Sequence, residues 1–199
     1  KDPVGVYEVG KMGQQKPEQW SEEKTRNETD IIKTRVSKMI EQELRDDPYA
    51  QEAFSKLLRQ AIEEAAKLFD HPLKQYLLFH EFEQKVQARK LDELPDAFAG
   101  NRHAQAYFGI FKKSLPEALG SADEQAQEHW VKLAFSLDGM VMTSVAEHSI
   151  NPQNIESDIR KKLLPLLFKE CKAVGAGMDQ AKAMVEWVVQ VTRVGLSGL

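Results

Sequence analysis

Apolar side chains recur every three or four positions along most of this chain, the spacing that places them on one face of a helix. Three such runs, at 21–44, 48–69 and 72–86, predict three long helices. Only two residues separate the second run from the third, so we expect these helices to pack as an antiparallel hairpin. The inward face predicted for the second helix is Ala50, Phe54, Leu57, Leu58, Ala61, Ile62, Ala65 and Phe69. That of the third is Leu73, Tyr76, Leu77, Phe79, Phe82 and Val86.

Polar residues and prolines mark where helices begin. Asp47, His71 and Asn151 each precede a proline, which fits a first helical turn because its missing N–H would have no partner there. Asn151 is the cap that we expect for a helix through the following basic segment. In the sequence SADE, Ser121 and Glu124 predict a capping box, in which each side chain satisfies a free backbone donor of the other residue.

The second half of the chain predicts four further helices. The first is a shorter one with Tyr107, Phe108, Ile110 and Phe111. The helix after SADE should bury Trp130, Leu133, Ala134, Leu137, Met140 and Val141. The last segment, near 179–196, contains the sequence WVVQVTRV, whose β-branched residues could also form a strand. We favour a helix because Ala181, Met184, Val185, Val188 and Val191 follow the helical period.

A proline interrupts the helix predicted within 149–169. Pro165 stands in the sequence LLPLLF, where it removes one backbone hydrogen bond and clashes with the preceding turn. We therefore expect a kink or a break, which would let apolar residues on both sides reach a curved core.

These patterns predict an all-α fold, a single domain of about seven helices at 21–199. Residues 1–20, which contain glycine and proline without helical spacing, predict a linker or an extended arm. The length of 199 residues fits one domain. No run approaches the roughly 20 apolar residues that a bilayer requires, so we expect no membrane partner. Because the chain begins at Lys1 without methionine, we expect a piece of a longer polypeptide, although a processed or tagged terminus would look the same.

Net charge and cysteine content narrow the range of possible partners and cellular compartments. The net charge of −4 is not typical of a nucleic-acid binder as a whole, although local basic patches remain open. The single cysteine, Cys171, can form no internal disulfide, and it favours a reducing compartment, the cytoplasm. We expect this thiol to be an inert residue of a helix face.

Motifs that would carry catalysis are missing from the sequence. No glycine-rich phosphate loop is present, and the five histidines show no zinc-ligand spacing, so we assign no catalytic, cofactor or metal residue. A nuclease built from Asp96, Glu170 and Lys172 is disfavoured. Its acid and lysine would lie two residues apart on a helix and point in different directions.

A basic ridge is the main candidate for binding. Lys161, Lys162, Lys169 and Lys172 share one side of the predicted helix, opposite an apolar floor of Ile155, Ile159, Leu163, Leu166 and Leu167. An ordinary solvated face is the plainer interpretation, because Asp158 lies in the same sector. Contact with an acidic partner surface or with phosphates is the alternative. Cations also align in the first helix, but acids interrupt them there; they are Lys24, Arg35, Lys38 and Arg45.

Three segments together resemble the C-terminal helical region of the R subunit, HsdR, of type I restriction-modification enzymes. They are MIEQELRDDPYAQEAFSKLLRQAIEEA, LFDHPLKQYLLFHEFEQKV and AEHSINPQNIESDIRKKLLPLLFK. The similarity runs from about Trp20 to Leu196. Its most specific part is the run in which SINPQNIE is followed closely by IRKKLLPLLF.

The resemblance implies a non-catalytic assembly domain. In that family the nuclease and the RecA-like ATPase domains, with their ATP and magnesium, precede this region, and the helical region docks the motor onto the methyltransferase core of M and S subunits. The implied partners are therefore this core and the motor domains of the same subunit. Two rivals stay open: a helical domain that binds duplex DNA directly, and a self-contained helical enzyme with its own pocket.

Overall fold

A computed structural model describes the backbone of residues 16–197 and the side chains of 16–195. This part of the chain is all-α, as predicted, with eight α-helices and no strand. The helix that the sequence pattern did not predict is the short α5. The helices are α1 (Glu22–Lys38), α2 (Pro48–Lys67), α3 (Pro72–Gln87), α4 (Arg102–Ser114), α5 (Pro116–Gly120), α6 (Glu124–Glu147), α7 (Ile155–Ala173) and α8 (Met178–Ser197). Residues 1–15 of the segment predicted as a linker or arm lie outside the described residues.

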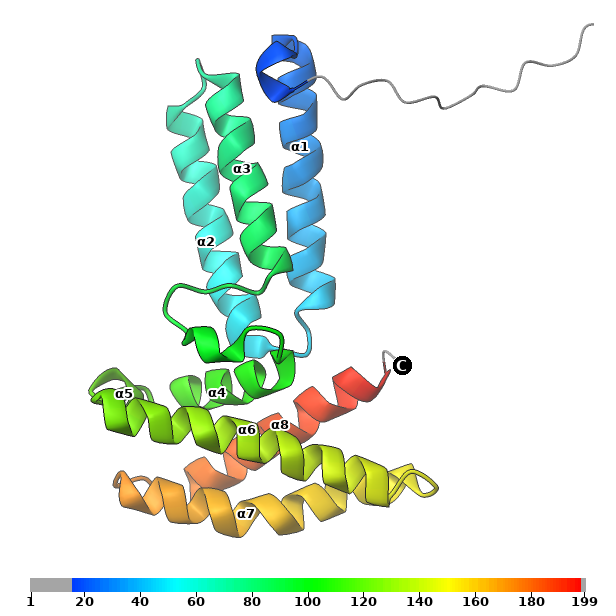
Figure 1. The fold of residues 1–199 in the computed structure, drawn as a ribbon, viewed down its shortest axis with the longest axis vertical. Coiled ribbons are helices and arrows are strands. Elements are labelled where there is room, and N and C mark those ends of the chain that lie inside the picture. Colours follow the sequence, from blue (N-terminus) through cyan, green and yellow to red (C-terminus); the bar gives the residue numbers. More distant parts are fainter. Residues whose placement is uncertain (1–15, 198–199) are drawn as a thin grey trace, which may run out of the picture.

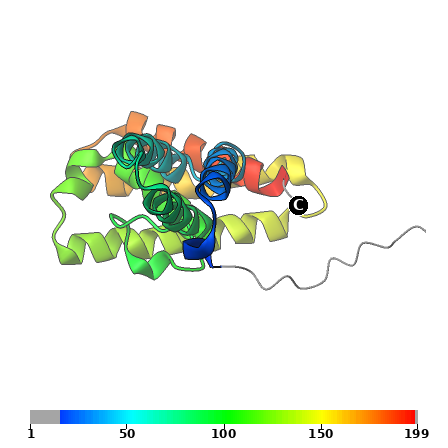
Figure 2. The same cartoon turned by 90° about the horizontal axis from the view of Figure 1, so that it is seen from above.

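The helices form two groups that cross each other (Figure 1). α1, α2 and α3 stand side by side as a three-helix bundle, in which α2 and α3 form the predicted antiparallel hairpin and α3 also packs along α1. α4 to α8 lie crosswise beneath this bundle. Figure 2 shows the three helices end-on above the second group. No described helix is long and apolar enough to cross a bilayer.

Each group encloses its own hydrophobic cluster. The upper cluster centres on Val36, Phe54 and Phe79, which are fully buried between α1, α2 and α3. The lower cluster is larger and joins α4, α6, α7 and α8 around Phe111, Leu137, Leu167, Met184 and Val188. One predicted domain therefore contains two cores.

Helix α4 joins the two groups through a close contact and a polar network. A Cβ atom added at Gly109 of α4 would lie 2.5 Å from the Cβ of Tyr49 in α2, so glycine permits this approach. Beside it, the Arg89 guanidinium pairs with Asp46 at 2.8 Å and donates to the Glu43 carbonyl. Arg89 has a φ of 50°, in the left-handed region. These bonds hold the end of α3 against the segment between α1 and α2.

Asp47 and Gln105 complete the polar network. The Gln105 amide donates to the Arg89 carbonyl at 3.0 Å and approaches the Asp47 carboxylate at 3.5 Å. Asp47 is fully buried and caps α2 by accepting from the Ala50 N–H at 2.9 Å. Burial raises the pKa of Asp47 to about 6, and the bond from Ala50 opposes that rise.

Three predicted helix starts are confirmed: α1 begins after Ser21, α2 at Pro48 and α3 at Pro72. Ser21 and Asp47 cap α1 and α2 with their side chains, whereas His71 makes no such bond. Two predicted caps are wrong. The SADE capping box does not form: Asp123 caps α6 instead, while the Ser121 hydroxyl donates back to the Glu117 carbonyl. Asn151 does not cap the basic helix either. A 3₁₀ turn at 152–154 comes first, and α7 begins at Ile155.

Pro165 does not break α7, which runs continuously from Ile155 to Ala173. The proline is exposed on the solvent side of the helix, where a carbonyl left without its helical partner can bind water. The WVVQVTRV segment is helical, and all five apolar residues predicted to face inward in α8 are buried.

The inward faces predicted for the upper bundle are only partly right. Phe54 and Phe79 are buried, but four residues predicted to face inward are exposed: Leu57, Ile62, Phe69 and Leu77. A three-helix bundle covers only part of each helix, so the widest apolar stripes extend into solvent. Phe69 at the end of α2 packs instead under the Arg26 guanidinium, 4.6 Å from the ring centroid.

Candidate functional site

The four lysines of the basic ridge do not share one environment. Lys161, Lys169 and Lys172 are exposed on α7, and none has an ion pair within the part of the chain that the structure describes. The apolar floor beneath them is present, with Ile155, Ile159, Leu163 and Leu167 buried and Leu166 half-buried. The exposed lysines therefore form a cationic surface on the solvent side of α7.

Lys162 points instead at the end of α6. Its ammonium lies 2.6 Å from the Glu147 carboxylate and 2.6 Å from that of Asp158, and it approaches the Ser144 hydroxyl at 3.3 Å. Its bond to Asp158, with that to Glu147, raises the pKa of Lys162, and the same bond lowers the pKa of Asp158. Lys162 therefore fixes α7 against α6 and does not belong to the free ridge.

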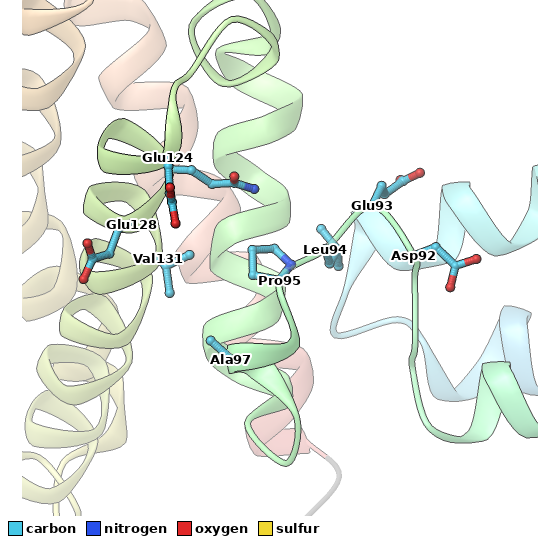
Figure 3. A pocket seen from close by; sticks show the side chains of 9 residues that line it. Asp92, Glu93, Leu94, Pro95, Ala97, Glu124, Glu128 and Val131 are labelled. Carbon is cyan, nitrogen blue, oxygen red and sulfur yellow. The ribbon is translucent and has the colours of Figure 1, made fainter.

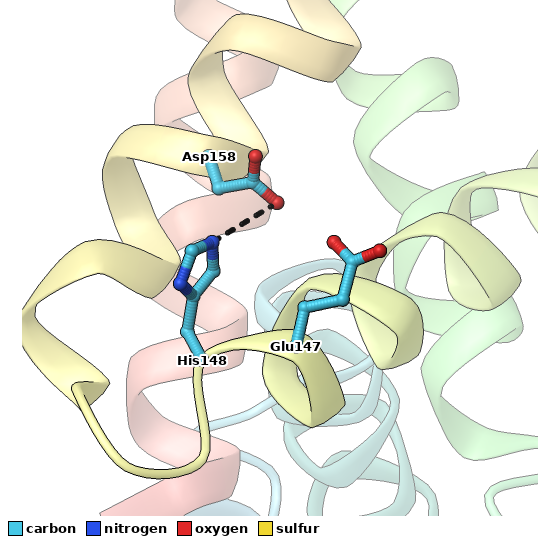
Figure 4. Close-up of side chains that lie close together, drawn as sticks. All are labelled: Glu147, His148 and Asp158. Atoms are coloured by element: carbon cyan, nitrogen blue, oxygen red, sulfur yellow. Dashed lines mark ion pairs between the residues drawn. The ribbon is translucent and has the colours of Figure 1, made fainter.

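Glu147, His148 and Asp158 gather in one place, as a metal site would require (Figure 4). His148 Nε2 lies 3.6 Å from Asp158 Oδ2. The ammonium of Lys162 already contacts both carboxylates and supplies the positive charge that a cation would supply. The cluster is therefore a compensated ion-pair group that closes the turn between α6 and α7.

Two adjoining hollows lie where the upper bundle meets the lower group, and we call them together the junction groove. One, of about 540 Å³, lies between α2 and α4; the other, of about 610 Å³, lies between α2 and α8. They share Glu52 and Lys113, whose side chains pair at 3.0 Å. The bonds from Lys56 and Lys113 lower the pKa of Glu52 to about 2. The Glu52 carboxylate is therefore fully ionised, and the ammonium groups of Lys56 and Lys113 balance its charge from two sides.

Cations outnumber acids in the junction groove. Five line it, namely Arg45, Lys56, Arg59, Lys112 and Lys113, against Glu52 and Glu93. The groove thus has an excess of positive charge in a chain whose net charge is −4. No local pattern in the sequence marks it, because its residues come from α2, α4, α5 and α8 and from two loops.

An acidic hollow of about 410 Å³ lies on the loop before α4 and the start of α6 (Figure 3). Asp92, Glu93, Glu124 and Glu128 line it. Figure 3 shows Asp92 and Glu128 at opposite sides with their carboxylates pointing apart. Glu128 pairs with Lys132 at 2.7 Å. These acids do not converge on a common point, as metal ligands must.

An apolar pocket of about 210 Å³ lies between α4, α6 and α8. His103 lines it, and His103 Nδ1 lies 3.7 Å from the Asp138 carboxylate. Burial raises the pKa of Tyr107, which also lines the pocket, to about 12. At neutral pH this phenol therefore keeps its proton and acts as no base.

Glu170 and Lys172 of the disfavoured nuclease set lie on α7, where Glu170 has a partner of its own. Glu170 pairs with His129 at 2.7 Å, and Cys171 between Glu170 and Lys172 is fully buried. Burial raises the pKa of the Cys171 thiol, so it stays protonated and unreactive, as predicted from its helix-face position.

Comparison with models of known protein families, with curated proteins and with solved structures found no match. The similarity to the R subunit accordingly rests on the three sequence segments alone.

Proposed function

We propose that this chain is a C-terminal helical assembly domain of the R-subunit type. Its role would be to dock an ATP-dependent DNA translocase and nuclease onto the methyltransferase core of M and S subunits in the cytoplasm. ATP and magnesium would be bound by the preceding motor and nuclease domains. The basic ridge would be part of the docking surface.

One observation supports this proposal above the others. The segment 149–169, the most specific part of the resemblance, forms a turn, a 3₁₀ turn and most of α7. The apolar side of α7 is buried, and its outer side exposes Lys161, Lys169 and Lys172. Exposed charges contribute little to folding. They can contribute to association, because charge complementarity steers and orients partners.

The test is co-purification of the chain with a methyltransferase core of M and S subunits. Replacing Lys161, Lys169 and Lys172 by glutamine should weaken binding by up to about 1 kcal/mol for each charge and reduce its salt dependence. A matched control replaces three exposed lysines of the upper bundle, Lys67, Lys74 and Lys90, and should bind as the parent does. Equal binding by the parent and the ridge variant at every salt concentration contradicts a docking role for the ridge.

A second assay addresses catalysis. The purified chain should hydrolyse neither ATP nor DNA with magnesium present, because both activities are expected in other domains of the parent subunit. Turnover that follows the protein through repeated purification would instead support a self-contained enzyme.

Direct binding to duplex DNA is the second candidate function, and the exposed cations of α7 favour it. Affinity that falls steeply with salt in the absence of M and S subunits would support it, because released counterions produce such a slope.

A further inference from the structure

We propose that the junction groove is a second interaction surface, which binds an acidic, partly apolar segment of a partner protein. It is distinct from the basic ridge of α7. The inference deepens the proposed function, on which it rests, by naming the chemistry of a partner segment. It is argued from the charge, the shape and the lining residues of the groove between α2, α4 and α8.

Two arginines in the groove have guanidinium ends free to bind. The Nε of each arginine donates to a carbonyl four residues earlier: that of Arg45, in the turn before α2, to Glu41 at 3.2 Å, and that of Arg59, in α2, to Ser55 at 3.3 Å. Both residues are exposed, and neither has an ion pair within the described part of the chain. Planar guanidinium groups suit carboxylates, which accept two parallel hydrogen bonds from them.

The lysines of the groove are held in place by their neighbours. Lys112 Nζ lies 5.4 Å from the centroid of the Tyr49 ring, and Lys113 Nζ lies 5.4 Å from that of Trp187. The Tyr49 hydroxyl donates to the Glu93 carboxylate at 2.6 Å. These contacts limit side-chain motion, so less conformational entropy is lost when a ligand binds.

Apolar surface accompanies this charge. Leu57 is 39% exposed at one edge of the groove, and the half-buried Trp187 lines its floor on α8. Aromatic and arginine side chains together are typical of protein interfaces, where they carry much of the binding energy. A segment with carboxylates on either side of an apolar residue would complement both features.

Shape and net charge favour a protein segment over nucleic acid. The groove consists of two hollows of about 540 and 610 Å³ where the two helix groups meet, a size that suits a few side chains of a partner segment. The chain as a whole has a charge of −4, which disfavours the approach of a long polyanion such as duplex DNA. A short acidic segment of a partner can enter the groove alone.

The test uses the full chain and a fluorescent peptide in which glutamates alternate with leucines. The Arg45→Gln, Arg59→Gln variant should bind about tenfold more weakly than the parent. The control variant Lys161→Gln, Lys172→Gln removes the same charge from α7 and should bind as the parent does. Arginine-to-lysine replacement at the two positions, which keeps the charge, should recover part of the affinity and exclude a folding defect as the cause.

Tryptophan emission localises the peptide independently. Peptide binding should change the emission of the parent and leave that of a Trp187→Phe variant nearly unchanged, since the other two tryptophans, Trp20 and Trp130, lie outside the groove. A change of equal size in the Trp187→Phe variant contradicts binding in the groove.

Other outcomes overturn the proposal and identify a different occupant. The proposal is wrong if the peptide does not bind, or if the groove variant and the α7 variant lose equal affinity for it. It is also wrong if labelled DNA binds in place of the peptide and only the groove variant loses affinity for the DNA. Self-association of the chain that the groove variant abolishes would identify a second copy. Docking onto the methyltransferase core is measured separately, so a parent chain that docks without binding the peptide rejects this inference and leaves the proposed function standing.

Discussion

The upper and lower helix groups bury different kinds of side chain. The lower group encloses almost only apolar residues, with Phe111, Leu137 and Leu167 fully buried. The upper bundle buries Glu83, whose carboxylate takes two bonds from the partly exposed Arg35 of α1, and Gln75, whose amide donates to the Ala65 carbonyl at 2.7 Å. Its helix pairing therefore depends on specific polar contacts, and that of the lower group on apolar packing.

This difference bears on stability and specificity. Apolar burial stabilises by roughly 25 cal/mol per Å² and has no preferred direction, so the larger lower core should hold most of the stability. Buried polar pairs add less net stability, and removing one partner is costly. We expect the upper bundle to open first, with faster amide exchange in α1 to α3 than in α4, α6 and α8.

The largest effect that tests this comparison comes from the lower core. Leu167→Ala should lower the free energy of unfolding by about 2–5 kcal/mol, because a fully buried leucine loses its contacts and leaves a cavity. Leu57→Ala is the matched control in the upper bundle. Since that side chain is 39% exposed, its loss should cost less than about 1 kcal/mol. Equal costs in denaturant unfolding contradict the division between the two groups.

The next effect concerns pH at the junction. Asp47 has a folded-state pKa of about 6 against an ordinary value of 3.8, so the folded state binds its proton more tightly than the unfolded state. Its contribution to stability is therefore fully present below about 3.8 and is lost as pH rises through about 6. The size is on the order of 1–3 kcal/mol.

Asp47→Asn should remove this pH dependence from unfolding measured between pH 4 and pH 7. Asp123→Asn is the control, because Asp123 also caps a helix but is exposed. A pH profile for Asp47→Asn that parallels that of the parent contradicts the assignment. Acid also protonates Glu52, whose pKa is lowered from 4.5 to about 2, so its contribution to stability is lost as pH falls from about 4.5 towards 2 and enters only the acid edge of this window.

The sequence pattern predicted the lower group better than the upper bundle, and burial explains why. Helices covered on several sides, such as α4 and α8, have apolar faces that agree with their period, so Tyr107 and Val188 lie where we predicted. In the thin upper bundle, a side chain like Phe69 fits the same period but is 64% exposed. Only the packing of neighbouring helices decides which edge of a wide stripe is covered.

The candidate sites show the same limit. The helical period placed Lys162 beside Lys161, and only the position of α6 turns Lys162 towards Glu147. Likewise, the SADE sequence contains two residues that could cap α6, Ser121 and Asp123. The Ser121 hydroxyl instead donates to the Glu117 carbonyl at the end of α5. The junction groove could not be predicted, because its residues are distant in sequence.

A smaller effect tests the close contact between the two groups. Gly109→Ala should cost about 1–3 kcal/mol, because the new methyl group would overlap the Tyr49 Cβ and push α2 away from α4. Gly139→Ala in α6 is the matched control. Nothing lies within 4 Å of its added Cβ, so the better helix propensity of alanine should stabilise the protein by about 0.5–1 kcal/mol. If both variants shift the melting temperature in the same direction, the contact is looser than described.

The smallest effect separates two adjacent lysines of α7. Lys161→Gln should leave the melting temperature unchanged, because this exposed side chain has no ion pair among the described residues. Lys162→Gln should lower it slightly, because Glu147 and Asp158 would lose the ammonium between them and repel each other. High salt should narrow the difference by screening that repulsion. Docking onto the methyltransferase core should show the reverse order, with Lys161→Gln the weaker binder. If Lys161→Gln lowers stability more than Lys162→Gln, the distinction between a structural and an interacting lysine is wrong.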